Sequence, residues 1–166
     1  MASPGHHATL HLPEEAATTQ LARRLGPRLT AGDAVLLSGD LGAGKSFLAR
    51  ALIRAVLNDP EAEVPSPTYT LVQAYATGGT EILHADLYRL SDANEVAETG
   101  LPDAMASAIC LIEWPDRLGD LTPPDALSLD LAPGPGETSR RLTLSADAPR
   151  WRETIDDLAR DHAQTA

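Results

Sequence analysis

The sequence predicts an α/β fold: a single phosphate-loop NTPase domain with a mixed, mainly parallel sheet flanked by helices, and with antiparallel hairpins. Three observations lead to this prediction. Residues Gly39–Ser46 read Gly-Asp-Leu-Gly-Ala-Gly-Lys-Ser, between an apolar run and a helical stretch. Apolar runs of strand length alternate with helical patterns along the chain. The 166 residues match one domain, with no linker long enough to divide residues 1–166.

The first elements form the start of a parallel α/β unit. A short strand is expected at Thr9–Leu12. The helix that opens at Pro13 repeats apolar residues every four positions as far as Leu29, which is typical of a helix lying on a sheet. Ala34–Leu37 is wholly apolar and predicts a strand, and Phe47–Leu57 predicts the helix that follows residues 39–46.

An antiparallel excursion follows. The segment Val64–Tyr69 contains two prolines, which forbid helix continuation, so we expect a loop. Thr70–Tyr75 and Glu81–Leu87 are β-rich runs around a Thr-Gly-Gly turn and predict a hairpin. Asp92, with Glu95 three residues later, indicates the capping box of a short helix.

The last third returns to the sheet. Ala108–Ile112 is wholly apolar and is expected to be a central strand, whereas Ala126–Leu131 and Arg140–Leu144 flank a Pro-Gly-Pro-Gly turn and predict a second hairpin. A helix at Arg150–His162 closes the chain. Residues 1–8 and 163–166 are expected to be frayed termini.

Composition restricts the class of protein. The net charge of -11 argues against a broad basic surface that grips nucleic acid, so a role on RNA would require a partner. Cys110 is the only cysteine and lies in an apolar run, which predicts a buried thiol. No apolar run approaches the roughly 20 residues of a spanning helix and no signal pattern precedes the domain, so a cytoplasmic protein without a membrane partner is expected.

Residues Gly39–Ser46, which we call the glycine loop, match the Gly-x4-Gly-Lys-Ser pattern of a nucleotide site. Glycines let the backbone aim its N–H groups at phosphate oxygens, and the following helix N-terminus favours negative charge. Lys45 is expected to neutralise the β- and γ-phosphates, and Ser46 to place its hydroxyl on Mg²⁺. The residues expected to bind the nucleotide here are Gly39, Asp40, Leu41, Gly42, Ala43, Gly44, Lys45 and Ser46.

Hydrolysis needs further groups, and three segments offer them. Asp86 ends a β-rich run, and Glu113 directly follows an apolar strand, as a Walker B carboxylate does. Either could hold the metal while the other orients water, and the sequence leaves this open. Thr68 lies in the proline-stiffened loop, where a hydroxyl could reach Mg²⁺ or the γ-phosphate.

Other polar residues near these segments receive structural interpretations. His84 is interpreted as a strand residue that packs or hydrogen-bonds locally rather than as a general base. Arg89 is interpreted as an ion-pair partner rather than an arginine finger, which predicts slow ATP hydrolysis by the protein alone. Trp114 fits either packing at a strand exit or a partner surface.

Together, and in this order, these segments resemble the bacterial TsaE family, also called YjeE, the ATPase of tRNA threonylcarbamoyladenosine biosynthesis. The resemblance comprises the glycine loop, Val64–Val72 with its Ser-Pro-Thr, His84–Arg89 with its His-x-Asp-Leu-Tyr-Arg, Glu95–Leu101 and Ile112–Pro115. Ser46 stands where the family usually has Thr, and residues 116–124 and the C-terminal helix follow no strong family pattern.

The resemblance implies Mg²⁺-dependent binding and hydrolysis of ATP to ADP. It implies a role in forming the modified adenosine at position 37 of ANN-decoding tRNAs, with TsaD and TsaB as partners and tRNA reached only through their complex. Lys45, Thr68, Asp86 and Glu113 would serve catalysis, and Ser46 with both acidic residues would serve the metal. Glu15 and Arg140 are the nearest matches to family positions that approach the nucleotide. The residues themselves leave two alternatives: a small-molecule kinase, or a binding module in which hydrolysis is incidental.

Overall fold

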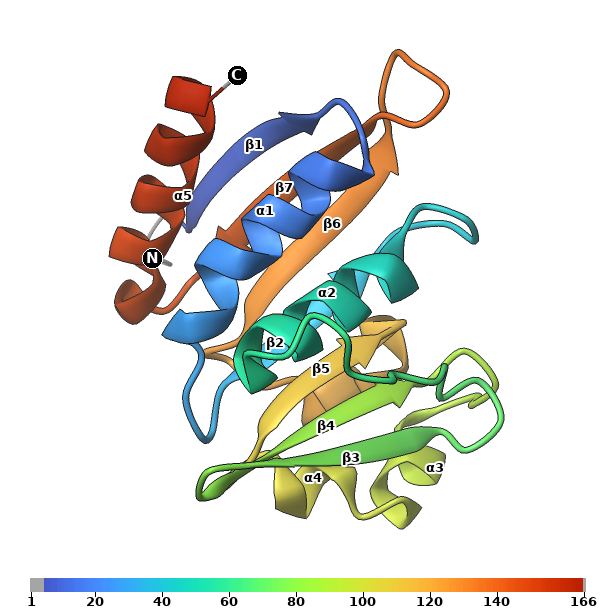
Figure 1. Cartoon of the computed structure of the whole chain (residues 1–166). Helices are drawn as coiled ribbons and strands as arrows, with labels where there is room; N and C mark the ends of the chain where they lie inside the picture. Colours follow the sequence, from blue (N-terminus) through green and yellow to red (C-terminus); the bar gives the residue numbers. More distant parts are fainter. Residues whose placement is uncertain (1–4, 166) are drawn as a thin grey trace.

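A seven-stranded sheet runs through the molecule in the order β1-β7-β6-β2-β5-β4-β3 (Figure 1). The structure is a computed structural model that describes residues 5–165. The strands are β1 His6–Leu12, β2 Ala34–Ser38, β3 Val72–Thr77, β4 Thr80–Asp86, β5 Ile109–Glu113, β6 Leu127–Pro133 and β7 Arg140–Ala146. The α-helices are α1 Glu15–Leu25, α2 Lys45–Leu57, α3 Ala93–Glu98, α4 Leu101–Ala104 and α5 Arg152–Thr165. Three 3₁₀ segments are η1 Gly26–Arg28, η2 Pro115–Leu121 and η3 Pro149–Trp151.

The sheet is mixed, as the sequence predicted, but it is not mainly parallel: three of its strand pairs are parallel and three are antiparallel. Strand β2 lies between β5 and β6 and is parallel to both, and β4 is parallel to β5. The predicted hairpins are antiparallel pairs, β3 with β4 and β6 with β7. Their turns contain the Gly-rich segments recognised in the sequence. The strand expected to be central, β5, lies inside the sheet beside β2.

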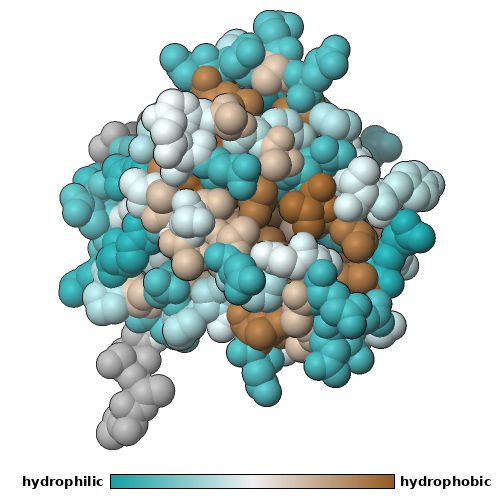
Figure 2. All heavy atoms as spheres, turned by 90° about the horizontal axis from the view of Figure 1, so that it is seen from below, coloured by the Kyte–Doolittle hydropathy of each residue, from teal (hydrophilic) through white to brown (hydrophobic). Residues whose placement is uncertain are grey.

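The two faces of the sheet carry separate cores. Helices α1, α2 and α5 pack on one face, where Leu25, Leu52 and Leu158 are almost wholly buried. Helices α3 and α4 cover the other face, against the Cys110 side of β5. On the side of the molecule that carries β3, α3 and α4, exposed apolar residues are surrounded by polar ones (Figure 2). The Cys110 thiol is buried as expected, and burial raises its pKa to about 12.

Regular secondary structure extends closer to both ends of the described residues than expected. Strand β1 begins at His6 rather than Thr9, because β7 offers a full-length antiparallel partner with which every residue from His6 to Leu12 pairs. Residues 163–165 belong to α5 rather than to a frayed end. The prediction of frayed ends is therefore wrong for residues 6–8 and 163–165, while residues 1–4 and 166 lie outside the described part. Within residues 5–165, no helix combines the length and apolarity needed to cross a membrane.

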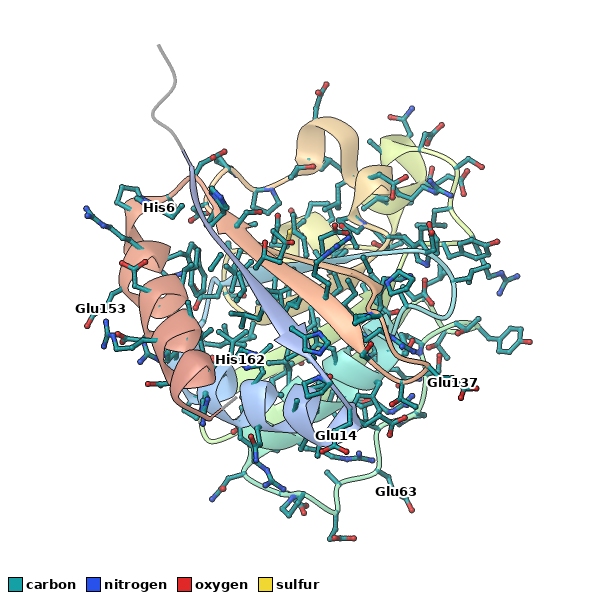
Figure 3. The ribbon with its side chains drawn as sticks, turned by 90° about the horizontal axis from the view of Figure 1, so that it is seen from above. His6, Glu14, Glu63, Glu137, Glu153 and His162 are labelled. Carbon is teal, nitrogen blue, oxygen red and sulfur yellow. The ribbon has the colours of Figure 1, made fainter. Side chains whose placement is uncertain are left out.

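The carboxyl ends of β2, β4 and β5 meet at one edge of the sheet because the three strands run parallel. The glycine loop follows β2, Asp86 ends β4, and Glu113 ends β5. At the rim of the molecule, Glu14, Glu63 and Glu137 project from the start of α1, the loop after α2 and the β6–β7 turn (Figure 3). The topology thus brings together the residues predicted to bind phosphate and metal, and it leaves other carboxylates at the surface.

Candidate functional site

A pocket of about 390 Å³ opens at this edge of the sheet. Four segments contribute to it: the glycine loop and start of α2, the loop before β3, the end of β4 and the end of β5. We call it the glycine-loop pocket. Its lining residues are Leu41, Gly42, Gly44, Lys45, Ser46, Phe47, Thr68, Asp86, Tyr88, Glu113 and Trp114. The structure therefore brings together all four residues for which the sequence predicted a catalytic role.

The glycine loop wraps around the N-terminus of α2. Gly39 has a φ of 143°, and a Cβ there would lie only 2.6 Å from the carbonyl oxygen of Leu131, so a side chain does not fit. Gly44 is the N-cap of α2 with a φ of 105°. The unpaired N–H groups of the first turn of α2, which has 13 residues, favour an anion at this end.

Lys45 lies almost buried beneath the loop, with 5% of its surface exposed. Its Nζ donates to the backbone oxygens of Gly39 and Asp40, the latter at 2.9 Å. Burial lowers the pKa of Lys45, and the nearby carboxylates of Glu113, Asp86 and Asp40 oppose that shift. The ammonium also lies 4.2 Å from the centre of the Trp114 ring. Lys45 is thus held at the base of the pocket.

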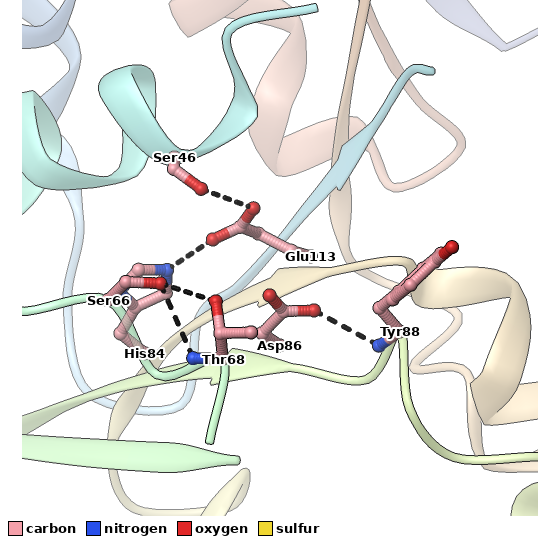
Figure 4. Close-up of polar contacts among 7 residues, drawn as sticks. All are labelled: Ser46, Ser66, Thr68, His84, Asp86, Tyr88 and Glu113. Atoms are coloured by element: carbon pink, nitrogen blue, oxygen red, sulfur yellow. Dashed lines mark hydrogen bonds and ion pairs between the residues drawn. The ribbon is translucent and has the colours of Figure 1, made fainter. Parts of the chain in front are cut away.

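Glu113, at the end of β5, contacts side chains on helix α2 and strand β4 (Figure 4). Its Oε1 accepts a hydrogen bond from Ser46 Oγ on α2 at 3.0 Å. Its Oε2 lies 2.7 Å from Nε2 of His84 on β4. Only 2% of Glu113 is exposed. Both carboxylate oxygens therefore have partners, and one of these is the hydroxyl predicted to bind Mg²⁺.

Asp86 faces the same pocket, in register with Glu113 across β4 and β5. Its Oδ1 accepts from the backbone N–H of Tyr88 at 3.0 Å. Burial raises the pKa of Asp86 and the charge of Glu113 adds to the rise, whereas the N–H of Tyr88 and the neighbouring His84 and Lys45 oppose it. Two carboxylates and one hydroxyl form an oxygen donor set of the kind that Mg²⁺ prefers. The described residues contain no group of three His, Cys, Asp or Glu side chains arranged for a metal.

Thr68 lies at the pocket within the predicted loop between α2 and β3. Its hydroxyl is 2.6 Å from that of Ser66, and its backbone N–H donates to the same Ser66 oxygen (Figure 4). The next residue, Tyr69, is 85% exposed. The threonine hydroxyl is therefore within the pocket but engaged locally.

Glu15 and Arg140 lie together in a second hollow of about 90 Å³ on the other side of the glycine loop. The hollow is lined by Glu15, Thr18, Ala43, Gly44, Phe47, Leu131, Glu137, Thr138 and Arg140. Arg140 Nε donates to the backbone oxygen of Ala43 at 2.8 Å, and Nη2 lies 3.4 Å from that of Gly42. Gly44 and Phe47 line this hollow and the glycine-loop pocket alike, so the two adjoin.

Three side chains depart from their sequence interpretation or extend it. His84 does not bond locally but reaches Glu113 on the neighbouring strand. Arg89 forms no ion pair with a residue in the described range 5–165, and its guanidinium lies 5.7 Å from the Tyr69 ring centre instead. Trp114 packs inside the site, with its ring 4.9 Å from that of Tyr88. The strand register that creates the His84 contact has no local sequence signal.

The family model and the relatives agree on one family. The family model described as "Threonylcarbamoyl adenosine biosynthesis protein TsaE" matches residues 12–142. The protein named tRNA threonylcarbamoyladenosine biosynthesis protein TsaE of Rickettsia felis is 38% identical over 122 residues, which cover 74% of this chain and 71% of the relative. The protein of the same name from Haemophilus influenzae is 45% identical over 84 residues, 50% of this chain and 52% of the relative. The crystal structure of Bacillus subtilis YdiB is similar in fold, with a TM-score of 0.76, 21% identity and coverage of 96% of this chain and 99% of that one.

Proposed function

The chain belongs to the TsaE family of tRNA threonylcarbamoyladenosine biosynthesis, and from this premise we propose that it is a Mg²⁺-dependent ATPase. In this proposal it works with TsaB and TsaD, in the cytoplasm, to form the threonylcarbamoyl group on adenosine 37 of ANN-decoding tRNAs. The relatives' names supply the pathway. The pocket supplies the side chains that would bind and hydrolyse ATP.

The hydrogen bond between Ser46 and Glu113 is the observation that carries the proposal. It joins the hydroxyl at the end of the glycine loop to a carboxylate at the end of the neighbouring parallel strand. This pairing is expected where a phosphate loop and a Walker B carboxylate share one Mg²⁺. The N-terminus of α2 and Lys45 add the positive potential that polyphosphate needs in a chain of net charge -11.

We assign different roles to the two carboxylates. Glu113 would hold Mg²⁺ together with Ser46, because it already contacts that hydroxyl. Bound Mg²⁺ supplies charge neutralisation at the β- and γ-phosphates. Asp86 would assist at the metal or accept a hydrogen bond from the attacking water, since its Oδ2 receives no hydrogen bond from the described residues.

Thr68 would act as the switch of the site. Its hydroxyl is hydrogen-bonded to that of Ser66. Exchange of this bond for a γ-phosphate oxygen or the metal would order the loop only when triphosphate is bound. The hollow beside Arg140 and Glu15 would accept the adenosine end of the nucleotide, because it adjoins the glycine loop at Gly44 and Phe47.

Partner proteins would dock over the mouth of the glycine-loop pocket. The large apolar side chains that stand most exposed, Leu41, Tyr69 and Tyr88, line this mouth or flank Thr68. Such clustering of exposed aromatic and aliphatic groups is typical of an interaction surface. The acidic charge makes direct grip on tRNA unfavourable, so tRNA would be reached through the complex.

The test follows the fate of the labelled γ-phosphate of ATP, with and without TsaB and TsaD, alongside formation of the modified tRNA. We expect free phosphate, and we expect Glu113→Gln to lower its release by about 100-fold or more, because a residue that holds Mg²⁺ is lost, while nucleotide still binds in EDTA. Glu63→Gln is the matched control, because Glu63 is an exposed carboxylate outside the pocket (Figure 3). A phosphorylated metabolite would identify a kinase instead. Full tRNA modification by Glu113→Gln without phosphate release would show that hydrolysis is dispensable.

A further inference from the structure

His84 is wholly buried at the point where β4 passes β5 and the start of α2. Its Nε2 lies 2.7 Å from Oε2 of Glu113, whose Oε1 accepts from Ser46 Oγ (Figure 4). Three side chains from three elements therefore form a continuous hydrogen-bonded chain. Since a carboxylate only accepts, the ring contributes the proton through Nε2. The chain ends at the hydroxyl that the proposed function places on the metal.

Packing alone does not explain a histidine at this position. The second ring nitrogen, Nδ1, is buried and has no hydrogen-bond partner among the described residues. A buried polar atom without a partner reduces stability, whereas leucine would fill the space without that cost. Among residues 5–165, the only polar partner of the imidazole is Glu113. The contact with the Glu113 carboxylate is therefore what explains a histidine at position 84.

We propose that His84 is a positioning residue: it holds the Glu113 carboxylate in the orientation in which Oε1 faces Ser46. This inference rests on the proposed ATPase site and adds a residue to it. Without His84, Oε2 is left buried without its donor, and Glu113 must turn toward another donor such as Lys45. The alignment between Glu113 and Ser46 is then lost. Partners that orient a metal-binding side chain typically contribute about 10–100-fold in metal affinity or activity.

The same sheet face offers a matched control. Tyr75 on β3 pairs with Ile82, two residues before His84, so both side chains point to the same face. The Tyr75 hydroxyl is also buried and without a partner among the described residues. Tyr75→Phe removes this polar atom and breaks no hydrogen bond. It alters the polarity of the face and leaves Glu113 untouched.

The test compares the wild type with His84→Leu, His84→Gln and Tyr75→Phe. Calorimetry measures binding of a non-hydrolysable ATP analogue with Mg²⁺ and again with EDTA, and phosphate release gives kcat. We expect His84→Leu to weaken Mg²⁺-dependent binding and kcat by about 10–100-fold and to leave binding in EDTA unchanged. We expect His84→Gln, whose side-chain Nε2 can also donate, to restore most of both, and Tyr75→Phe to match the wild type.

Each result decides between explanations. Unchanged Mg²⁺-dependent binding and kcat in His84→Leu would overturn the inference. So would equal losses in His84→Leu and His84→Gln accompanied by weakened binding in EDTA, which would make His84 purely structural. A wild type that releases no phosphate, combined with the expected loss of Mg²⁺-dependent binding in His84→Leu, would remove the proposed hydrolysis and keep the inference. A wild type that binds no nucleotide would overturn both.

Discussion

Arg140 holds the C-terminal hairpin against the glycine loop, and its removal gives a quantitative test of the site. The contact is formed chiefly by Nε, which donates to the Ala43 carbonyl at 2.8 Å. The Nη2 contact with Gly42 at 3.4 Å is long and adds little, and Nη1 bonds to Ser139 within the same hairpin. One good hydrogen bond from a charged donor therefore supports the loop.

The expected effect of Arg140→Ala follows from that bond. A hydrogen bond from a charged donor contributes about 1.5–3 kcal/mol. If the loop needs this contact to hold its phosphate-binding conformation, the same free energy is lost from nucleotide binding. At 1.4 kcal/mol per factor of ten, the Kd for ADP rises about 10-fold to 150-fold.

The assay is a calorimetric titration with ADP at fixed ionic strength. Arg141→Ala is the control: it removes the same charge from the adjacent position, where the side chain is exposed and the backbone pairs with His11. The change in net charge is the same in both variants, so their difference reports what Arg140 does locally, through its contact with Ala43 and as part of the lining of the second hollow. Affinities within twofold of each other would refute the reasoning.

Three further changes test the site. In metal-free protein, Asp86→Asn should unfold at a higher temperature than the wild type at pH 7. Burial raises the pKa of Asp86 in the folded state above its value of about 3.9 in the unfolded chain. Protonated Asp86 therefore stabilises the fold below pH about 3.9, and this stabilisation is lost as the pH rises through the folded-state pKa. The gain should shrink as the pH falls toward about 4, and a gain that is independent of pH would contradict the assignment. Gly39→Ala should abolish ADP binding, as measured by calorimetry, because a Cβ would lie 2.6 Å from the Leu131 oxygen; wild-type affinity would show that the loop adapts. Nucleotide should change the fluorescence of Trp114, whose ring lies 4.2 Å from the Lys45 ammonium, and Trp114→Phe should remove that change.

The sequence predicted the parts of the site that depend on local pattern. The glycine loop has a fixed spacing, and Glu113 follows a wholly apolar segment, so both could be assigned before any tertiary contact was known. Parallel strands then imply that Asp86 and Glu113 share an edge of the sheet. The interior position of β5 followed from the apolar character of its sequence in the same way.

Contacts set by register could not be predicted. His84 reaches Glu113 because β4 pairs it with Leu111, and a shift of one residue would turn the ring to the opposite face. Nothing within a window of neighbouring residues encodes that alignment. The start of β1 was missed for a related reason: the His-His-Ala segment has no strand pattern of its own and becomes a strand only by pairing with β7.

The long reach of Arg140 has a consequence for how the protein is made. The arginine and Ala43 are 97 residues apart in the sequence, and both strands that flank β2 also come after the glycine loop. While the chain emerges from the ribosome, the loop exists for most of its synthesis without the neighbours that hold its shape. If the loop binds ATP as proposed, nucleotide would stabilise only chains that have been synthesised at least as far as Arg140, and cellular ATP would favour these over shorter ones at the moment of folding.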